Sequence, residues 1–74
     1  MKLRPARPAD VVRVLGRLGF ARIRQSGSHA VFHHPDCRWT TVPIHSSDVA
    51  KGTLRRILKD VGITVDEFER TRRG

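Results

Sequence analysis

A histidine in the segment RQSGSHAVFHH, residues 24–34, is the residue in this sequence best suited to chemistry. An imidazole, with an ordinary pKa of about 6.5, can take up or release a proton near neutral pH. Arg22 and Arg24 lie on the expected neighbouring strand, and cations there could hold a phosphate group. His29 could then move the proton at the 2′-hydroxyl or at the leaving oxygen during RNA cleavage, without a metal ion. The alternative is an exposed strand histidine that only contacts phosphate.

Two other kinds of site are disfavoured by residue spacing. The candidates for a metal site are His33, His34, Cys37 and His45. Structural zinc sites normally present paired ligands, whereas His33 and His34 are neighbours in a strand and point to opposite sides of it. Ser28 lacks the G-x-S-x-G context of a hydrolase nucleophile, and its side chain should point away from that of His29. We therefore expect no metal, no small-molecule cofactor and no serine nucleophile.

The segment Lys51-Gly52-Thr53 is a second candidate for anion binding. It lies at the expected start of a helix, where unpaired backbone N–H groups and the helix dipole favour negative charge. Lys51 adds a full positive charge beside them. A plain helix start with a solvated lysine explains these residues equally well.

These candidates depend on a few helices and strands for their positions. Apolar residues recur at helical spacing between Pro8 and Leu18, at positions 11, 12, 15 and 18. Pro8 suits a first helical turn, and Gly19 suits the residue after a helix. Ser26-Gly27 and residues 35–38 have the length and composition of hairpin turns. They separate three segments of β character: Phe20–Gln25, Ser28–His34 and Trp39–Ile44.

Alternation along the three expected strands assigns their side chains to two faces of a sheet. The set expected to face the core comprises Ala21, Ile23, Ala30, Phe32, Thr40 and Val42. The opposite face then carries a cationic, aromatic and imidazole-rich set: Arg22, Arg24, His29, Val31, His33, Trp39 and Thr41. Trp39 could stack on a base there, although a tryptophan at the edge of the core is an equally good interpretation.

Two further helices are expected after the strands. The first runs from about Lys51 to Val61 and ends at Gly62; its expected buried residues are Leu54, Ile57, Leu58 and Val61. Thr64-x-x-Glu67 is a capping box, with Ile63 and Phe68 at the hydrophobic staple positions, so a last helix is expected from Val65 to about Arg72. The pattern predicts an α+β fold of α-β-β-β-α order plus an extra C-terminal helix. Its three-stranded antiparallel sheet should carry helices on one face.

Length and charge narrow the classes of partner. The 74 residues predict one domain, residues 1–74, whose small core favours a large external substrate over an enclosed cofactor. The 15 Lys+Arg against 7 Asp+Glu give a net charge of +8, which attracts nucleic acid, an acidic protein or an anionic membrane. No segment approaches the roughly 18 apolar residues of a membrane span, and no signal-peptide core follows the basic start. With one cysteine, no intramolecular disulfide is possible, and a cytoplasmic protein is expected.

An ordered series of motifs in this sequence resembles the HicA toxin family. The motifs are Leu15…Gly19-Phe20, Arg24-Gln25-x-Gly27-Ser28-His29, Phe32-x-His34-Pro35, Thr41-Val42-Pro43, Lys51-Gly52-Thr53-Leu54-x-x-Ile57-Leu58 and Gly62-Ile63. Each motif alone is weak, but the ordered combination is specific and covers nearly the whole chain. Ala30 after the motif histidine and the basic extension through Arg7 depart from the family pattern. Neither departure affects His29.

The resemblance implies a double-stranded-RNA-binding-domain-like fold and a toxin of a type II toxin-antitoxin system. It implies a metal-independent endoribonuclease that cleaves mRNA, uses His29 as its catalytic residue and is neutralised by a HicB-type antitoxin. With that activity, the expected RNA contacts are Arg22, Arg24, Ser28, Lys51, Thr53 and Arg55, with Trp39 as a candidate for base stacking. Two alternatives stay open: a noncatalytic RNA-binding module, and a positive surface that mainly binds an acidic protein.

Overall fold

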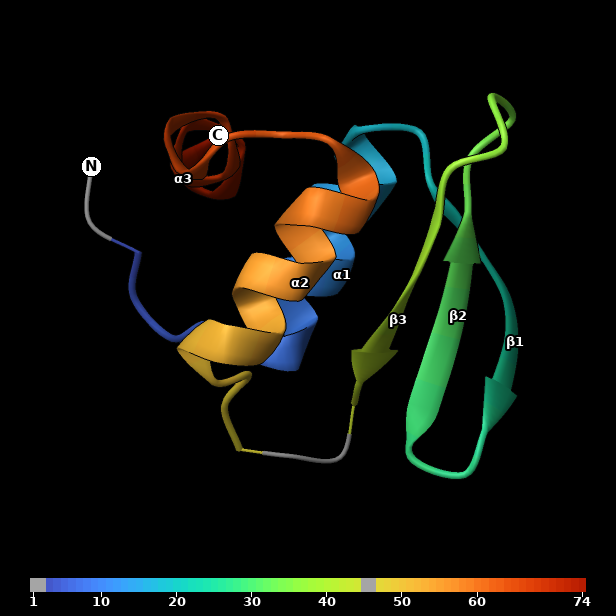
Figure 1. Cartoon of the computed structure of the whole chain (residues 1–74). Helices are drawn as coiled ribbons and strands as arrows, with labels where there is room; N and C mark the ends of the chain where they lie inside the picture. The colour runs from blue at the N-terminus through green and yellow to red at the C-terminus, as the bar shows by residue number, and fades with distance from the viewer. Residues whose placement is uncertain (1–2, 45–46) are drawn as a thin grey trace.

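The computed structural model has the expected order of elements (Figure 1) and describes residues 3–44 and 47–74. The elements are α1 (Pro8–Arg17), β1 (Ala21–Ser26), β2 (His29–His33), β3 (Trp39–Pro43), α2 (Lys51–Val61) and α3 (Val65–Arg73). The strands form one antiparallel sheet in the order β1-β2-β3, and α1 and α2 lie on one side of it. The α+β class with a three-stranded open sheet is therefore confirmed. His45, considered above as a metal ligand, lies outside the described residues.

The core is built from apolar side chains of the helices and of the sheet face that meets them. α1 begins with Pro8 and buries Val11, Val14 and Leu15. Val12 and Leu18, also expected on its buried face, are only partly buried. α2 buries the predicted set of Leu54, Ile57, Leu58 and Val61, and the strands contribute Ala30, Phe32 and Val42.

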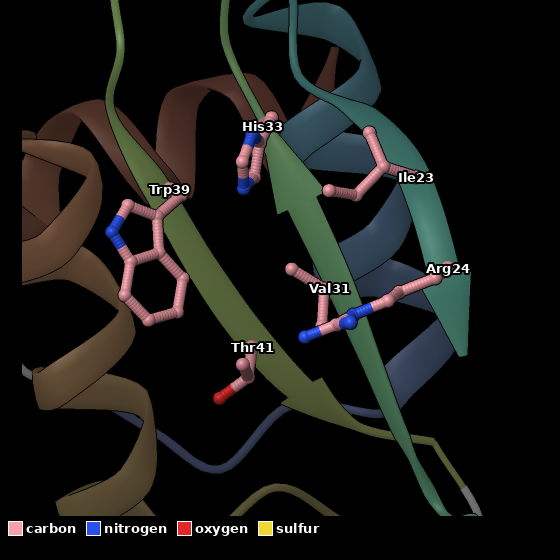
Figure 2. Close-up of a pocket in the computed structure, with 6 residues that line it drawn as sticks. All are labelled: Ile23, Arg24, Val31, His33, Trp39 and Thr41. Atoms are coloured by element: carbon pink, nitrogen blue, oxygen red, sulfur yellow. The ribbon is translucent and has the colours of Figure 1, made fainter. Parts of the chain in front are cut away.

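A β-bulge in β1 changes which of its side chains face this core. Arg22 pairs with Phe32 and Arg24 pairs with Val31, so Ile23 is the extra residue between them. The expectation that Ile23 points inward is wrong, because its side chain is 52% exposed and lies on the outer face of the sheet (Figure 2). Arg22 lies instead on the inner side, with its guanidinium 5.6 Å from the centroid of the Phe32 ring. One inserted residue inverts the alternation on which the prediction depended.

The register of β2 and β3 follows the predicted alternation. Thr40 pairs with Phe32, and Val42 with Ala30, and all four are buried on the inner face. Ala21 was also expected to face inward, but it precedes the bulge and is exposed. Only β1, the edge strand with the bulge, departs from the expected faces.

The turn between β1 and β2 is Gly27-Ser28, one residue later than the expected Ser26-Gly27. Ser26 pairs with His29 across the turn, and Gly27 has a φ of 59°. A positive φ at the first of two turn residues is typical of a type II′ hairpin, where glycine is strongly favoured. The turn therefore places His29 at the first position of β2.

Local signals also define the last two helices. α2 ends at Gly62, whose φ is 81° and whose N–H donates to the Leu58 carbonyl at 2.8 Å. This is the left-handed cap that glycine favours. α3 begins after Thr64, whose Oγ1 accepts a hydrogen bond from the backbone N–H of Glu67 at 3.1 Å. The predicted capping position is confirmed, and α3 packs against α1.

Candidate active site

His29 is exposed at the end of the sheet. Its neighbours across the ladder are Ser26 on β1 and Pro43 on β3. No hydrogen bond or ion pair joins its imidazole to another residue in the described part of the chain. Both ring nitrogens are therefore available to a substrate. The expectation that this ring stands clear of the core is confirmed.

His29 lines a hollow of about 490 Å³, which we call the His29 hollow. The sheet contributes His29 and Pro43 to it. The segment before α2 and the first turns of α2 supply the other lining residues: Asp48, Val49, Ala50, Thr53 and Arg56. The start of β2 and the start of α2, far apart in the sequence, thus form one site.

A backbone bridge to the N-terminal segment holds the residues just before α2. Val49 is buried and forms a bridge with Ala6, with its N–H 2.7 Å from the Ala6 carbonyl oxygen. Ala50, at the N-cap, makes no side-chain capping hydrogen bond, and the first turn contains no acidic residue. The first N–H groups of α2 are therefore left for another acceptor, and such a helix start favours a phosphate.

Arg56 is a lining residue whose role the sequence analysis missed. One of its terminal nitrogens donates to the Asp60 carboxylate and the other to the Thr41 carbonyl, both at 2.9 Å. The same Asp60 oxygen accepts a hydrogen bond from the buried Thr40 hydroxyl at 2.9 Å. These bonds hold the guanidinium in place between α2 and β3. The spacing of four residues between Arg56 and Asp60 is typical of a pair on one helix face. Nothing in the sequence indicates the contact of Arg56 with β3.

The expected phosphate contacts fall into separate groups. Thr53 lines the His29 hollow, and Lys51 is exposed at the first position of α2. Ser28 is half-buried in the turn next to His29, where its carbonyl accepts the Ile44 N–H at 2.8 Å. Arg55 is exposed on α2 and does not line the hollow. Ser28 is thus next to His29 along the chain, Thr53 shares the hollow with it, and Lys51 follows the lining residue Ala50.

Arg22 and Arg24, expected on the same face, lie on opposite sides of β1. Arg22 donates to the Gln25 side chain at 3.4 Å and lines a hollow next to the start of α1, together with Pro8 and Ala9. Arg24 lies on the outer face of the sheet. The assignment of Arg22 to the outer face is therefore wrong, and the cause is the bulge.

A second hollow, the outer hollow, occupies the outer face of the sheet (Figure 2). Its lining residues are Ile23, Arg24, Val31, His33, Trp39 and Thr41. The Trp39 side chain is 57% exposed, as the alternation predicted, and its ring centroid lies 6.2 Å from that of His33. An exposed aromatic ring, Trp39, and a cation, Arg24, therefore line the same hollow on this face.

A third hollow, which we call the connecting hollow, shares lining residues with each of the other two. It is lined by Cys37, Arg38, Trp39, Thr41, Arg56 and Asp60. Trp39 and Thr41 also line the outer hollow, and Arg56 also lines the His29 hollow. A continuous surface therefore runs from the outer face of the sheet, past Trp39 and Arg56, to His29.

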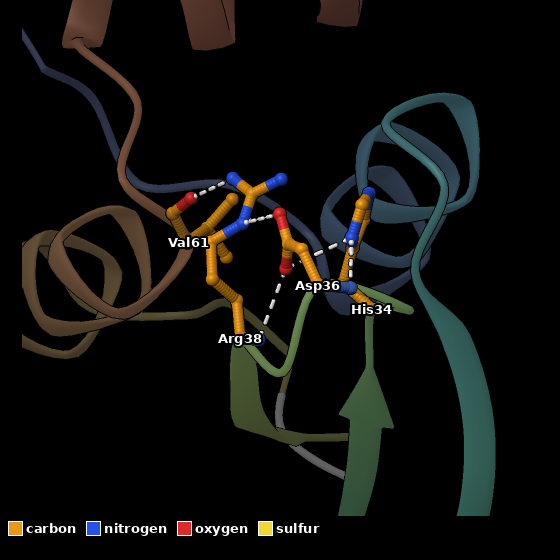
Figure 3. A network of polar contacts seen from close by, with 4 residues as sticks. All are labelled: His34, Asp36, Arg38 and Val61. Carbon is orange, nitrogen blue, oxygen red and sulfur yellow. Dashed lines mark hydrogen bonds and ion pairs between the residues drawn. The ribbon is translucent and has the colours of Figure 1, made fainter.

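Polar contacts fix the β2–β3 loop at the Trp39 end of this surface (Figure 3). Asp36 accepts hydrogen bonds from the backbone N–H of Arg38 at 3.1 Å and from its Nε at 2.8 Å. Arg38 also donates to the Val61 carbonyl at the end of α2, and His34 Nδ1 lies 2.9 Å from the Asp36 carboxylate. Desolvation opposes ionisation of Asp36, but the hydrogen bonds and charge of Arg38 outweigh it, and the pKa of Asp36 is lowered.

The chain matches a known protein family. Residues 8–63 match the family model described as HicA toxin of bacterial toxin-antitoxin. No curated protein matches the chain. In the part of the chain that the structure describes, no helix is both long and apolar enough to cross a bilayer.

Proposed function

Because this chain belongs to the HicA toxin family, we propose that it is an endoribonuclease that cleaves mRNA without a metal ion. Family membership makes it the toxin of a toxin-antitoxin pair and implies an antitoxin partner. The observation that carries the proposal is the exposed imidazole of His29 in a hollow that also receives the uncapped start of α2 and the Arg56 side chain. A group that transfers protons is thereby combined with groups that bind phosphate.

In the proposed reaction, His29 accepts the proton of a ribose 2′-hydroxyl. The 2′-oxygen attacks the adjacent phosphorus, so a bond forms between them and the bond from phosphorus to the 5′-oxygen breaks. The imidazolium then returns the proton to that 5′-oxygen. The products are a 2′,3′-cyclic phosphate and a 5′-hydroxyl, and one histidine serves first as base and then as acid.

Charge and backbone dipoles would hold the substrate during this step. We assign the phosphate at the cleaved bond to Thr53, Arg56 and the first N–H groups of α2, because these groups share the hollow with His29. The flanking phosphates are assigned to Arg24, Ser28, Lys51 and Arg55. Arg22 is assigned to a more distant phosphate, because it lies on the inner side of β1.

The antitoxin is proposed to be of the HicB type and to act by denying RNA access to the His29 hollow. The toxin would function in the cytoplasm as one domain over residues 1–74. Its net charge of +8 would attract both mRNA and an acidic antitoxin surface, so the two partners would compete for the same cationic groups.

Replacement of His29 tests the proposal directly. His29→Ala should lower the rate of RNA cleavage by about 100-fold or more, because it removes the only proposed proton-transfer group. RNA affinity should change little, since the cationic groups remain. Cleavage would be followed by gel electrophoresis in the presence of EDTA, with analysis of the fragment ends, and binding by fluorescence anisotropy.

Ser26→Ala is the matched control, because Ser26 pairs with His29 across the hairpin and contributes no proposed catalytic group. This variant should cleave RNA like the wild type. If His29→Ala cleaved as well as the wild type, the catalytic assignment would be wrong. If wild-type protein bound RNA but never cleaved it, the alternative of a noncatalytic RNA-binding module would replace the proposal.

A further inference from the structure

Two large apolar side chains that lie outside the core line the outer hollow. Ile23 and Trp39 are the exposed large hydrophobic residues of the described chain, at 52% and 57% exposure. Both line this one hollow on the face of the sheet away from α1 (Figure 2). Single exposed apolar residues are ordinary, but two that share a hollow suggest a binding surface.

The bulge in β1 is what brings Ile23 to this surface. Regular alternation would have placed Ile23 on the inner face, where this short chain could have used it in its core. The bulge instead puts Ile23 and Arg24 together opposite Val31. Bulges commonly redirect side chains near functional sites. The apolar character of the outer hollow therefore depends on a specific backbone feature.

The chemistry of the lining suits a nucleobase with its phosphate. Trp39 offers an exposed indole face, and the His33 ring lies 6.2 Å away at an interplanar angle of 47°. Arg24 makes no hydrogen bond or ion pair with any other residue in the described ranges, unlike Arg22, Arg38 and Arg56. None of the lining residues is acidic. An exposed aromatic surface and an unpaired cation in one hollow favour a stacked base and its phosphate.

The outer hollow is also connected to the proposed site of cleavage. Trp39 and Thr41 line both it and the connecting hollow, and Arg56 lines both the connecting hollow and the His29 hollow. A strand of RNA that leaves His29 can therefore follow one surface, past a guanidinium, to the indole. The two hollows can act on one substrate molecule.

We propose that the outer hollow is a nucleobase-binding subsite that seats one unstacked base of a single-stranded RNA whose backbone reaches His29. The subsite deepens the proposed function and depends on it for its biological role. Bases inside an A-form duplex remain stacked and paired, so they cannot enter such a hollow. The substrate class is therefore single-stranded RNA.

Trp39 is itself the probe for this subsite. It is the only tryptophan in a chain without tyrosine, so the intrinsic fluorescence reports on this residue alone. A short oligouridylate added to His29→Ala protein, which should bind without cleaving, is expected to quench that fluorescence. A duplex RNA of the same length and inorganic polyphosphate should bind through charge without comparable quenching. Equal quenching by polyphosphate, or none by the oligonucleotide, would overturn the proposal.

Variants in the same background measure the contribution of the hollow, with labelled oligouridylate followed by anisotropy. Ile23→Ala, Arg24→Ala and Trp39→Ala should each weaken binding by about tenfold, whereas Trp39→Phe should retain most of it, because phenylalanine still stacks. Arg73→Ala, which removes one exposed charge at the far end of α3, should stay within about twofold of the parent. Thermal unfolding of each variant would show that its fold is intact.

The subsite and the proposed function fail in different ways. If wild-type protein cleaves RNA through His29 but the Ile23, Arg24 and Trp39 variants bind and cleave as well as their parents, the subsite is wrong and the nuclease stands. If these variants lose affinity only for the antitoxin, the outer hollow is a protein-binding surface and the subsite is again wrong. If oligouridylate quenches Trp39 but no RNA is ever cleaved, the subsite stands and the nuclease is wrong.

Discussion

Cys37 has the only positive φ among the non-glycine residues that the structure describes. Its φ is 81°, in the left-handed region that costs an ordinary residue about 1–2 kcal/mol. The loop requires this conformation: the Cys37 N–H donates to the His34 carbonyl, and the His34 N–H donates to the Arg38 carbonyl, both at 2.9 Å. These bonds form a three-residue hairpin loop that ends in a left-handed residue. Cysteine thus occupies a position that suits glycine.

Replacement of Cys37 should stabilise the protein. We expect Cys37→Gly to raise the free energy of unfolding by about 0.5–1 kcal/mol. Glycine removes the free-energy cost of the left-handed conformation, and this gain exceeds the free energy lost because glycine increases the entropy of the unfolded chain. The measurement is urea unfolding under reducing conditions. Cys37→Ala removes the thiol but keeps the strained φ, so it should not stabilise. If alanine stabilised as much as glycine, the backbone explanation would be wrong.

Among the elements, α2 is the one that completes the site, and contacts in its C-terminal half hold it against β3 and the β2–β3 loop. In its last turn, Asp60 accepts hydrogen bonds from Thr40 and Arg56, so α2 is held against β3. At its C-terminal end, the Val61 carbonyl accepts a hydrogen bond from Arg38 of the β2–β3 loop. These contacts set where the N-terminal turn of α2 lies relative to His29.

The ion pair within the β2–β3 loop gives this connection a pH dependence. Because Arg38 lowers the pKa of Asp36 below its ordinary value of 3.8, the folded state binds that proton less tightly than the unfolded chain. The stability that the Asp36 carboxylate contributes is therefore fully present above the pKa of Asp36 in the unfolded chain. It is lost as the pH falls through the lower pKa of Asp36 in the folded protein. Asp36→Asn should be less stable than the wild type at neutral pH and lose less stability on acidification. Equal acid sensitivity of both proteins in denaturant unfolding would contradict this.

For the molecule as a whole, the proposed attraction of RNA would depend on the distribution of charge. The net charge of +8 is spread over the surface, and many arginines are engaged in bonds within the protein. Lys51 and Arg55 are exposed on α2 and make no hydrogen bond or ion pair within the described residues. Such unpaired cations can release counterions from RNA when they meet its phosphates.

Salt dependence should identify the cations that contact RNA. In the His29→Ala background, the slope of the logarithm of affinity against the logarithm of salt should become shallower by about 0.7 for each of Lys51→Ala and Arg55→Ala. Affinity at low salt should fall as well. Arg70→Ala on α3 removes the same charge away from the proposed path and should leave the slope unchanged. An equal change for Arg70→Ala would mean that net charge, not phosphate contact, governs binding.

Features that depend on residues a few positions apart could be predicted from the sequence. The three helices, the buried stripe of α2, the cap at Thr64 and the left-handed end at Gly62 were all predictable, because helix period and capping are local. His29 could be identified as an exposed candidate, since β2 follows simple alternation. Both His29 and Thr53 could therefore be identified as candidates from the sequence.

Which side chains share a hollow depends instead on packing between segments that are far apart in the sequence. The bulge that moves Ile23 outward and Arg22 inward depends on pairing between strands, which periodicity along one strand cannot reveal. Arg56 shares one hollow with His29 and another with Trp39 because α2 packs against β3 through Thr40 and Asp60, and no spacing in the sequence encodes that arrangement. Contacts between distant segments form only when the whole chain packs, so the shape of the site could not be predicted from local sequence patterns.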